Sequence, residues 1–353
     1  MKLLVFGGKG GVGKSSISTA TAVKIADLAP DKKVLLISFD IAHNLSDLFG
    51  KDVGNDLTQI TDNLWAIEPD PDAYAEKYTQ VFATKMRKLA KSMPIVGMMP
   101  QLEEFIEKTF THNSIPLSLK NSMFFQRILD ASEVIENIGE EDDELARMKF
   151  DYIVCDFPPT GNMIALFEVP KNQIQVIMKY SLETMAQVRE FTKGIKKITS
   201  LFNPFSSKKS QEQRNLSQEI IDMLNDVEQR GSRVADMLET EGSLRLVSIA
   251  EKPSFEEIKR GAELTKPYIQ LDGIHVNRII QERFTENCEM CNIQRTNQEK
   301  YINKIKEFFD DKKVWVSHRL TIEPIGTDGL MALANEIYGE DAQVEEIIHP
   351  DGS

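Results

Sequence analysis

The chain has 353 residues, enough for a large core and for about two domains. Its 55 acidic residues outnumber its 42 basic ones, and the net charge of −13 argues against a nucleic-acid partner bound through bulk charge. Three cysteines are too few for a disulfide framework, and with no signal-peptide pattern and no apolar run long enough to cross a bilayer we expect a cytoplasmic protein.

The first predicted elements are a strand over 3–6 and a helix over 17–28, joined by a glycine-rich loop. The loop holds the pattern G-x-x-x-x-G-K-S, which is typical of nucleoside triphosphate sites. Successive backbone N–H groups of such a loop can point at a phosphate, and the helix N-terminus adds partial positive charge. Lys14 could then reach the outer phosphates, and the Ser15 hydroxyl could ligate Mg²⁺. The residues expected to contact the nucleotide are Gly8, Lys9, Gly10, Gly11, Val12, Gly13, Lys14, Ser15 and Ser16.

The second position of this loop is also a lysine, Lys9. A lysine there resembles the deviant Walker A subgroup of P-loop NTPases, in which it reaches across a dimer to the partner's nucleotide. Its role resembles that of an arginine finger supplied in trans, which neutralises charge in the phosphoryl-transfer transition state. A solvated loop lysine is the plainer interpretation.

Further continuous apolar runs follow the loop, as expected for strands buried on both faces of a parallel sheet. They alternate with helical patterns, which favours a doubly wound, mostly parallel α/β fold of the P-loop NTPase type. The predicted strands lie at 34–38, 152–155, 174–178, 244–249, 274–276 and 314–316.

Two of these strands lead into an aspartate at the edge of the sheet where ligands bind. Asp40 follows the strand 34–38 and could orient the water that attacks the γ-phosphate, or it could simply cap the next helix. Asp156 follows the strand 152–155 and could hold Mg²⁺, through water. The turn over 157–161 could respond to the γ-phosphate as switch loops do.

Two long segments interrupt the alternation with Met- and Phe-rich apolar stripes at helical spacing. These stripes could pack on one another, or some of them could line a groove for an apolar guest, a use that suits the flexible methionine side chain. The predicted organisation is an α/β nucleotide-hydrolase domain over 1–77, 145–181 and 241–340, an inserted helical subdomain over 78–144 and 182–240, and a disordered tail over 341–353.

Cys288 and Cys291 form a single C-x-x-C pair. One pair supplies two thiolates, whereas a structural zinc site has four ligands. A second pair from a two-fold-related copy would complete a Cys₄ site, in agreement with the dimer that Lys9 indicates. A redox pair, or two thiols that bind nothing, are the alternatives.

In their order along the chain, these motifs resemble the ArsA family of ATPases. The resemblance is strongest to its homodimeric guided-entry branch, which carries tail-anchored membrane proteins. It extends to about residue 337. The matching motifs are G-G-K-G-G-V-G-K-S-S at 7–16, D-x-A-H-N-L-S-D at 40–47, D-x-x-P-T-G at 156–161, the segments 249–251 and 276–278, and the C-x-x-C with Arg295, Gln298 and Tyr301 behind it.

The resemblance implies hydrolysis of ATP with Mg²⁺ in a homodimer. It implies that Lys9 acts in trans, that Lys14 and Ser15 bind phosphate and magnesium, and that Asp40 activates water. The helical segments of two chains would form a hydrophobic groove for the transmembrane helix of a client, opened and closed by the nucleotide state. A membrane receptor would then be a further partner.

Three further roles are implied for residues late in the chain. Glu251 would approach the nucleotide of the opposite subunit, and Asn277 would recognise the adenine. Cys288 and Cys291 would hold Zn²⁺ shared between the two subunits.

The chain departs from the family pattern beside the two aspartates. Phe39 and Ile41 stand where the family has Thr and Pro, and Phe157, Pro158 and Asn162 replace Thr, Ala and His. These changes lie close to the chemistry and bear on the hydrolysis rate and on nucleotide coupling. Two other functions are the alternatives. An arsenite-pump ATPase is disfavoured because the helical segments contain no cysteine, and an iron–sulfur carrier of the same superclass would not need these segments.

Overall fold

The computed structural model describes residues 1–40, 45–70, 127–132, 145–164, 166–167 and 211–350, together with helical positions at 80, 84, 85 and 88. The chain divides into two compact units. The first comprises Met1–Asp70, Arg127–Glu168 and Ala235–Ser353, and the second comprises Pro71–Gln126 and Val169–Val234.

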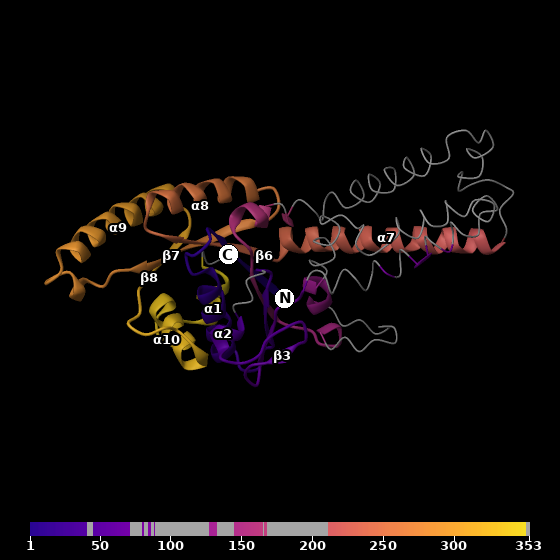
Figure 1. Ribbon diagram of the computed structural model, residues 1–353, viewed down its shortest axis with the longest axis horizontal. Helices are drawn as coiled ribbons and strands as arrows, with labels where there is room; N and C mark the ends of the chain where they lie inside the picture. Colours follow the sequence, from indigo (N-terminus) through magenta and orange to yellow (C-terminus); the bar gives the residue numbers. More distant parts are fainter. Residues whose placement is uncertain are drawn as a thin grey trace, which may run out of the picture. The chain divides into compact units, whose positions relative to one another are not determined.

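An eight-stranded sheet forms the centre of the first unit (Figure 1), with the order β3-β4-β2-β5-β1-β6-β7-β8. Every neighbouring pair is parallel except β3 with β4. The prediction of a doubly wound, mostly parallel α/β fold is therefore confirmed. The strands are β1 (Lys2–Gly8), β2 (Val34–Ser38), β3 (Thr58–Gln59), β4 (Leu64–Ile67), β5 (Tyr152–Asp156), β6 (Gly242–Ile249), β7 (Gln270–Ile279) and β8 (Lys313–His318).

Burial on both faces explains why most of these strands could be predicted. All five residues of β2 are buried, and so are six of the seven residues of β1. The strands β3 and β4 were not predicted, because β3 has two residues and β4 has four and neither gives a long apolar run. The strand predicted at 174–178 lies outside the described residues.

Helices cover both faces of the sheet (Figure 1). One face carries α1 (Lys14–Leu28), α2 (Leu45–Phe49), α10 (Gly326–Tyr338) and α11 (Val344–Ile348), which share one hydrophobic core. The other face carries α8 (Lys252–Thr265) and α9 (Glu289–Phe308). Two 3₁₀ turns, η3 (Leu145–Arg147) and η4 (Glu282–Phe284), precede β5 and α9.

The helix α11 corrects the prediction of a disordered tail over 341–353. Ile347 and Ile348 are buried in the core beside α1 and α10. The guanidinium of buried Arg245 donates from Nη2 to the carbonyl oxygen of Ile347 at 3.0 Å. A capping box between Gln343 and Glu346 closes the start of the helix. The tail is therefore ordered through residue 350, because two isoleucines in a polar stretch complete the core.

The helix α7 (Gln211–Thr240) runs for 30 residues, which confirms helix over the second half of the predicted segment 182–240. Near the end of α7, the side chains of Val234 and Leu238 are buried. In the second unit, Lys85 Nζ lies 2.7 Å from Glu219 Oε2 of α7. Within the described residues, no helix is both long and apolar enough to cross a membrane.

The boundaries of the second unit differ from the predicted 78–144 and 182–240, and residues 127–132 show one such difference. Residues 127–132 had been assigned to the helical subdomain, whereas the structure groups them with the sheet. Ile128 and Leu129 are buried there, and the Phe150 N–H just before β5 donates to the carbonyl oxygen of Ala131 at 3.2 Å. The remaining positions of 78–126 and 168–210, including the Met- and Phe-rich stripes, lie mostly outside the described residues.

Candidate nucleotide site

A glycine-rich loop joins the carboxyl end of β1 to the start of α1. Gly13 is the N-cap of α1 with a φ of 94°, in the left-handed region that favours glycine. A Cβ on Gly13 would lie 2.4 Å from Asn277 Nδ2, and a Cβ on Gly8 would lie 2.2 Å from the carbonyl oxygen of Val247. These glycines therefore let the loop approach β6 and β7 more closely than any other residue type would.

The rest of the loop presents its backbone at the edge of the sheet. Residues 9–11 are exposed, whereas Val12 is buried beneath them. Lys14 is the first residue of α1, and Ser15 and Ser16 are half-buried in its first turn. The positive end of a 15-residue helix thus lies where the motif places the phosphates.

Lys14 and Asp40 approach each other beside this loop. Lys14 Nζ lies 3.7 Å from Asp40 Oδ2, and the lysine is buried. Asp40 comes just after β2, and its backbone N–H donates to Ser38 Oγ at 3.4 Å. The cation that could meet the outer phosphates and the carboxylate that could orient a water are therefore neighbours. Residues 41–44, including Ile41, lie outside the described part of the chain.

Asp156 ends β5 between the two strands that carry these residues. Its Cα pairs with that of Phe6 on β1 and that of Ser38 on β2. The side chain is fully buried, and burial raises the pKa of Asp156 to about 7, although nearby Ser15 and Lys14 lower it. No hydrogen bond of normal geometry reaches either carboxylate oxygen.

A buried carboxylate with two oxygens free of hydrogen bonds is what a hydrated Mg²⁺ would satisfy. Ser15 is close enough to Asp156 to affect its pKa, so the hydroxyl and the carboxylate could serve the same ion. Lys14 and Asp40 also influence the pKa of Asp156. The donor set therefore fits Mg²⁺ with a triphosphate.

Glu68 is a further carboxylate near this site that the sequence analysis did not single out. It follows β4, is buried, and raises the pKa of Asp156, which places it beside the same site. Its Oε1 accepts from the backbone N–H of Leu45 at 2.9 Å and so holds the start of α2. The sequence does show an acidic residue directly after the apolar run 64–67, as at Asp40 and Asp156. That run has only four residues, so it was not predicted to be a strand and Glu68 was not considered.

Two departures from the family pattern contact each other. The rings of Phe39 and Phe157, which follow β2 and β5, have centroids 5.1 Å apart. Phe157 also stacks on Phe167, with centroids 5.3 Å apart. Both Phe39 and Phe157 are buried, so an aromatic contact joins the residue before Asp40 to the residue after Asp156. A Cβ on Gly10 would lie 3.8 Å from Pro159 Cγ, so this turn also faces the phosphate loop.

Asn277, expected to recognise adenine, contacts the phosphate loop. Its Nδ2 donates to the carbonyl oxygen of Val12 at 3.0 Å, and its Oδ1 accepts from Ser317 Oγ at 3.1 Å. The backbone N–H of Arg278 also donates to this oxygen, at 2.8 Å. The buried amide thus holds the phosphate loop through the Val12 carbonyl group. Recognition of adenine by Asn277 stays a prediction.

Glu251 and Lys9, which were expected to approach a second chain, are both exposed. Glu251 is the exposed N-cap of α8, directly after β6, and Lys9 is exposed after β1. Both elements end at the same edge of the sheet. The position of both side chains at this surface is compatible with approach to a second copy, and their roles stay predictions.

Cys288 and Cys291 lie at the start of α9. Cys288 is the N-cap, and its Sγ accepts from the backbone N–H of Cys291 at 3.2 Å. Hydrogen bonding from Cys291 lowers the pKa of the Cys288 thiol, and the same contact raises the pKa of Cys291. The pair could supply two thiolates of a metal site. Within the described residues, no cluster of three or more such ligands surrounds it.

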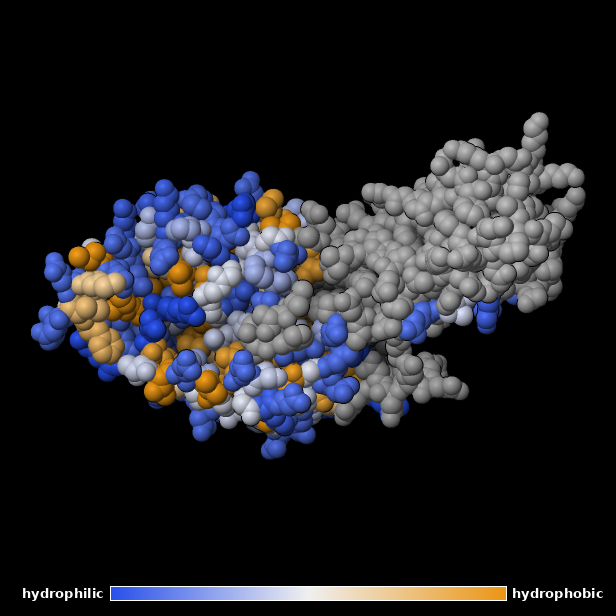
Figure 2. Space-filling view, in the orientation of Figure 1, coloured by the Kyte–Doolittle hydropathy of each residue, from blue (hydrophilic) through white to orange (hydrophobic). Residues whose placement is uncertain are grey.

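Three large apolar side chains are exposed near this pair. Met290 and Ile293 are 68% and 55% exposed, and Phe284 is 44% exposed. Figure 2 shows hydrophobic residues on this end of the first unit, near the start of α9. Exposed methionine and isoleucine beside two cysteines are features of a surface that another chain could cover.

Known proteins match this chain over nearly its whole length. A profile of the anion-transporting ATPase family covers residues 1–339. The "ATPase ASNA1 homolog 1" of Paramecium tetraurelia is 28% identical over 94% of this chain and 90% of its own length. The "ATPase GET3" of Komagataella phaffii is 25% identical over 94% of this chain and 88% of its own length. The "Putative arsenical pump-driving ATPase 2" of Aquifex aeolicus is 26% identical, with coverages of 88% and 90%.

Proposed function

Because the chain belongs to the anion-transporting ATPase family and is therefore an ATPase, we propose that it is a homodimeric targeting factor for tail-anchored membrane proteins. In this proposal, ATP binding and hydrolysis control a groove that shields the transmembrane helix of a client. The groove would be built from the Met- and Phe-rich segments over 78–144 and 182–240. The relatives named ASNA1 and GET3 support this choice within the family.

The observation that carries the proposal is the composition of the second unit. The residues proposed for the ATPase site lie outside it, since the phosphate loop, Asp40, Asp156 and Glu68 all belong to the first unit. The second unit nevertheless contains much of a 30-residue helix, α7, whose sequence has apolar residues at a seven-residue spacing. Burying a client helix there would be favourable at about 25 cal/mol per Å² of apolar area.

The geometry of the first unit supports the proposed catalytic roles. The phosphate loop and Lys14 bind the phosphates, and Asp40 orients the attacking water. Ser15 and Asp156 would hold Mg²⁺, which neutralises phosphate charge when bound. Lys9 of the partner subunit would neutralise the charge that grows on the γ-phosphate. Exclusion of bulk water by a second chain would strengthen each of these contacts.

The dimer would also complete the cysteine site. Two copies of Cys288 and Cys291 around a two-fold axis supply the four thiolates of a tetrahedral Zn²⁺ site. The exposed apolar side chains beside the pair would then be covered by the same contact. A colourless protein with about one Zn²⁺ per two chains is expected. Visible absorption from an anaerobic preparation would instead favour the iron–sulfur carrier.

Capture of a client without detergent tests the targeting function. The protein is co-expressed with a tagged protein that ends in one transmembrane helix, and the complex is purified in aqueous buffer. We expect a soluble complex that is lost when the helix is replaced by a polar segment of equal length. A Lys14→Ala variant, impaired in nucleotide binding, serves as a second control. Clean ATPase activity without any complex would contradict the proposal.

One alternative is an arsenite-linked ATPase, because a relative is named as a putative arsenical pump-driving ATPase. Arsenite binds thiols, and the three cysteines of the chain are Cys155, Cys288 and Cys291. Cys155 is buried in β5, so only the pair on α9 is accessible within one chain. ATPase activity that rises with arsenite and is insensitive to a client helix would support this alternative over targeting.

A further inference from the structure

An irregular stretch at the end of β7 adjoins the phosphate loop. The pairing of β7 with β8 shifts between Val276 and Ile279. Within this shift, Arg278 has a φ of 61° and is, among the residues that the structure describes, the one non-glycine residue with positive φ. An arginine keeps this conformation only where surrounding contacts fix it.

Two donors of this stretch hold carbonyl groups of the phosphate loop. Arg278 Nη1 donates to the carbonyl oxygen of Gly11 at 2.9 Å, and Asn277 Nδ2 donates to that of Val12 at 3.0 Å. In a trans peptide the C=O and the following N–H point in opposite directions. Holding these carbonyls on the β7 side therefore turns the N–H groups of Val12 and Gly13 toward the opposite side. Such N–H groups are the ones that cradle phosphates in this motif.

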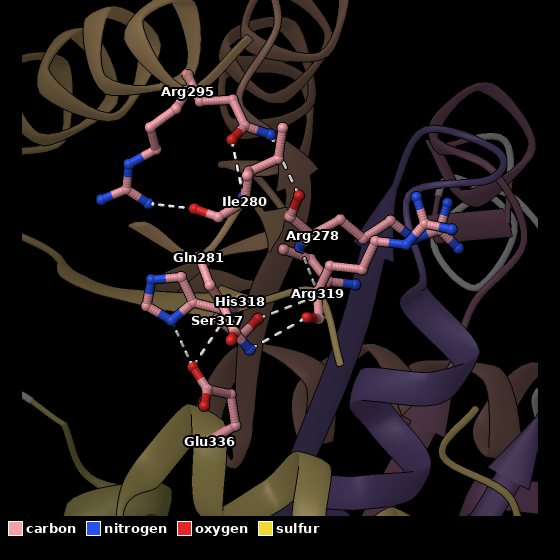
Figure 3. A network of polar contacts seen from close by, with 10 residues as sticks. Arg278, Ile280, Gln281, Arg295, Ser317, His318, Arg319 and Glu336 are labelled. Atoms are coloured by element: carbon pink, nitrogen blue, oxygen red, sulfur yellow. Dashed lines mark hydrogen bonds and ion pairs between the residues drawn. The ribbon is translucent and has the colours of Figure 1, made fainter. Parts of the chain in front are cut away.

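Two side chains of α9 also contact this stretch, and Figure 3 shows one of them, Arg295, directed toward Ile280. The amide of Gln298 makes two contacts, since Nε2 donates to the Arg278 carbonyl oxygen at 3.2 Å and Oε1 accepts from the Ile280 N–H at 2.9 Å. Arg295 Nη1 donates to the Ile280 carbonyl oxygen at 2.8 Å. Residues 295 and 298 are three apart and thus lie on one face of the helix.

From this geometry we propose that Arg278 is a positioning residue for nucleotide binding, and that Gln298 acts through it. The side chain of Arg278 orients the phosphate loop, and Gln298 keeps the backbone of Arg278 in the conformation that this requires. The phosphate loop is thereby tied to α9, the helix that begins at Cys288. A displacement of α9 then changes the affinity for nucleotide. This inference concerns nucleotide binding alone and holds whether or not the protein carries a membrane helix.

Affinity for a fluorescent ADP analogue, with Mg²⁺, tests the inference. Arg278→Ala and Gln298→Ala should each weaken binding by about tenfold, the effect of one lost hydrogen bond to a charged or tightly held group. The double variant should bind the analogue at most about threefold more weakly than the weaker-binding single variant, because both residues act through one backbone conformation. Gln294→Ala, on the exposed side of the same helix, should bind as the wild type does.

Two further variants separate positioning from folding. Arg278→Gly accepts positive φ without strain, so it should fold normally and still bind about tenfold more weakly. Arg278→Lys keeps a donor and a charge and should recover part of the affinity. Thermal unfolding without nucleotide reports the fold of each variant. Wild-type affinity in Arg278→Gly would overturn the role of Arg278, and wild-type affinity in Gln298→Ala would overturn the tie to α9.

Discussion

At the scale of single residues, the carboxylates around the phosphate loop differ in their environment. Asp40 lies 3.7 Å from the Lys14 ammonium and is partly exposed. Asp156 is fully buried, and no hydrogen bond of normal geometry reaches its oxygens. Burial favours a protonated Asp156 until a cation arrives. The two aspartates are thus suited to water activation and to metal binding, respectively.

The raised pKa of Asp156 predicts a pH dependence of stability in the absence of nucleotide and Mg²⁺. The pKa is about 7 in the folded protein and 3.8 as the ordinary value, so between these values the folded state binds more protons than the unfolded state. Stability from this group is therefore full below the lower value and is lost as the pH rises through about 7. Asp156→Asn has no titrating carboxyl group at this position, so it should not lose this stability as the pH rises.

Urea unfolding at pH 5 and at pH 7.5 measures this effect. The gain in stability from Asp156→Asn over the wild type should be larger at pH 7.5 by on the order of 2 kcal/mol. Saturating Mg²⁺ and ADP should cancel the gain, because the cation stabilises the charged carboxylate of the wild type. An equal gain at both pH values would show that Asp156 does not titrate in this range.

Glu68 gives a second prediction at this scale. Glu68→Ala removes the acceptor for the Leu45 N–H and leaves the start of α2 unsatisfied. We expect the turnover number for ATP to fall about tenfold and stability to fall by about 1–3 kcal/mol. Glu68→Gln keeps an acceptor oxygen and should recover most of both. The exposed Glu307→Ala is the control, and a Glu68→Ala enzyme with normal turnover would contradict the role.

At the scale of elements, the short helix α11 contributes to the core of the first unit. Its residues Ile347 and Ile348 are 2% and 4% exposed. Ile347→Ala should lower the free energy of unfolding by about 2–5 kcal/mol, through lost apolar contacts and the cavity that remains. Glu345→Ala on the exposed side should change it by less than about 0.5 kcal/mol. Chemical denaturation distinguishes the two, and equal stabilities would mean that α11 is not packed in solution.

The contrast between α11 and β2 shows which elements could be predicted from sequence. The run Val34–Ser38 is apolar throughout because both faces of β2 are covered, so its pattern carries its own signal. The segment 341–350 is mostly polar, and two isoleucines make it ordered only because Arg245 and the core lie beneath them. Such an effect depends on residues about a hundred positions away, which no local pattern reports.

The same limit applies to the nucleotide site. The motif predicted the position of the phosphate loop, of Asp40 and of Asp156, because each follows a strand whose pattern is visible. It did not predict that Asn277 and Arg278 hold the loop, since these contacts join residues more than 260 positions apart. The contact of Phe39 with Phe157 was equally invisible, because each had been considered as a separate departure.

At the scale of the whole molecule, the proposed role of Lys9 is to act on the site of a second copy of the chain. Lys9 is exposed after β1, whereas Lys14, Asp40 and Asp156 line the site within one chain. If Lys9 acts in trans, each active site needs Asp40 from one chain and Lys9 from the other. A Lys9→Ala chain and an Asp40→Asn chain would then complement each other in a mixed dimer.

Mixing these two variants tests the proposed dimeric ATPase most directly. Each variant alone should lose at least about 100-fold in turnover, since each lacks a group that acts on the transferred phosphate. After subunit exchange, half of the dimers are mixed and each mixed dimer has one intact site, so activity should return to about one quarter of the wild type. If activity stays at the level of the separate variants despite confirmed exchange, Lys9 does not act in trans and the dimeric site is contradicted.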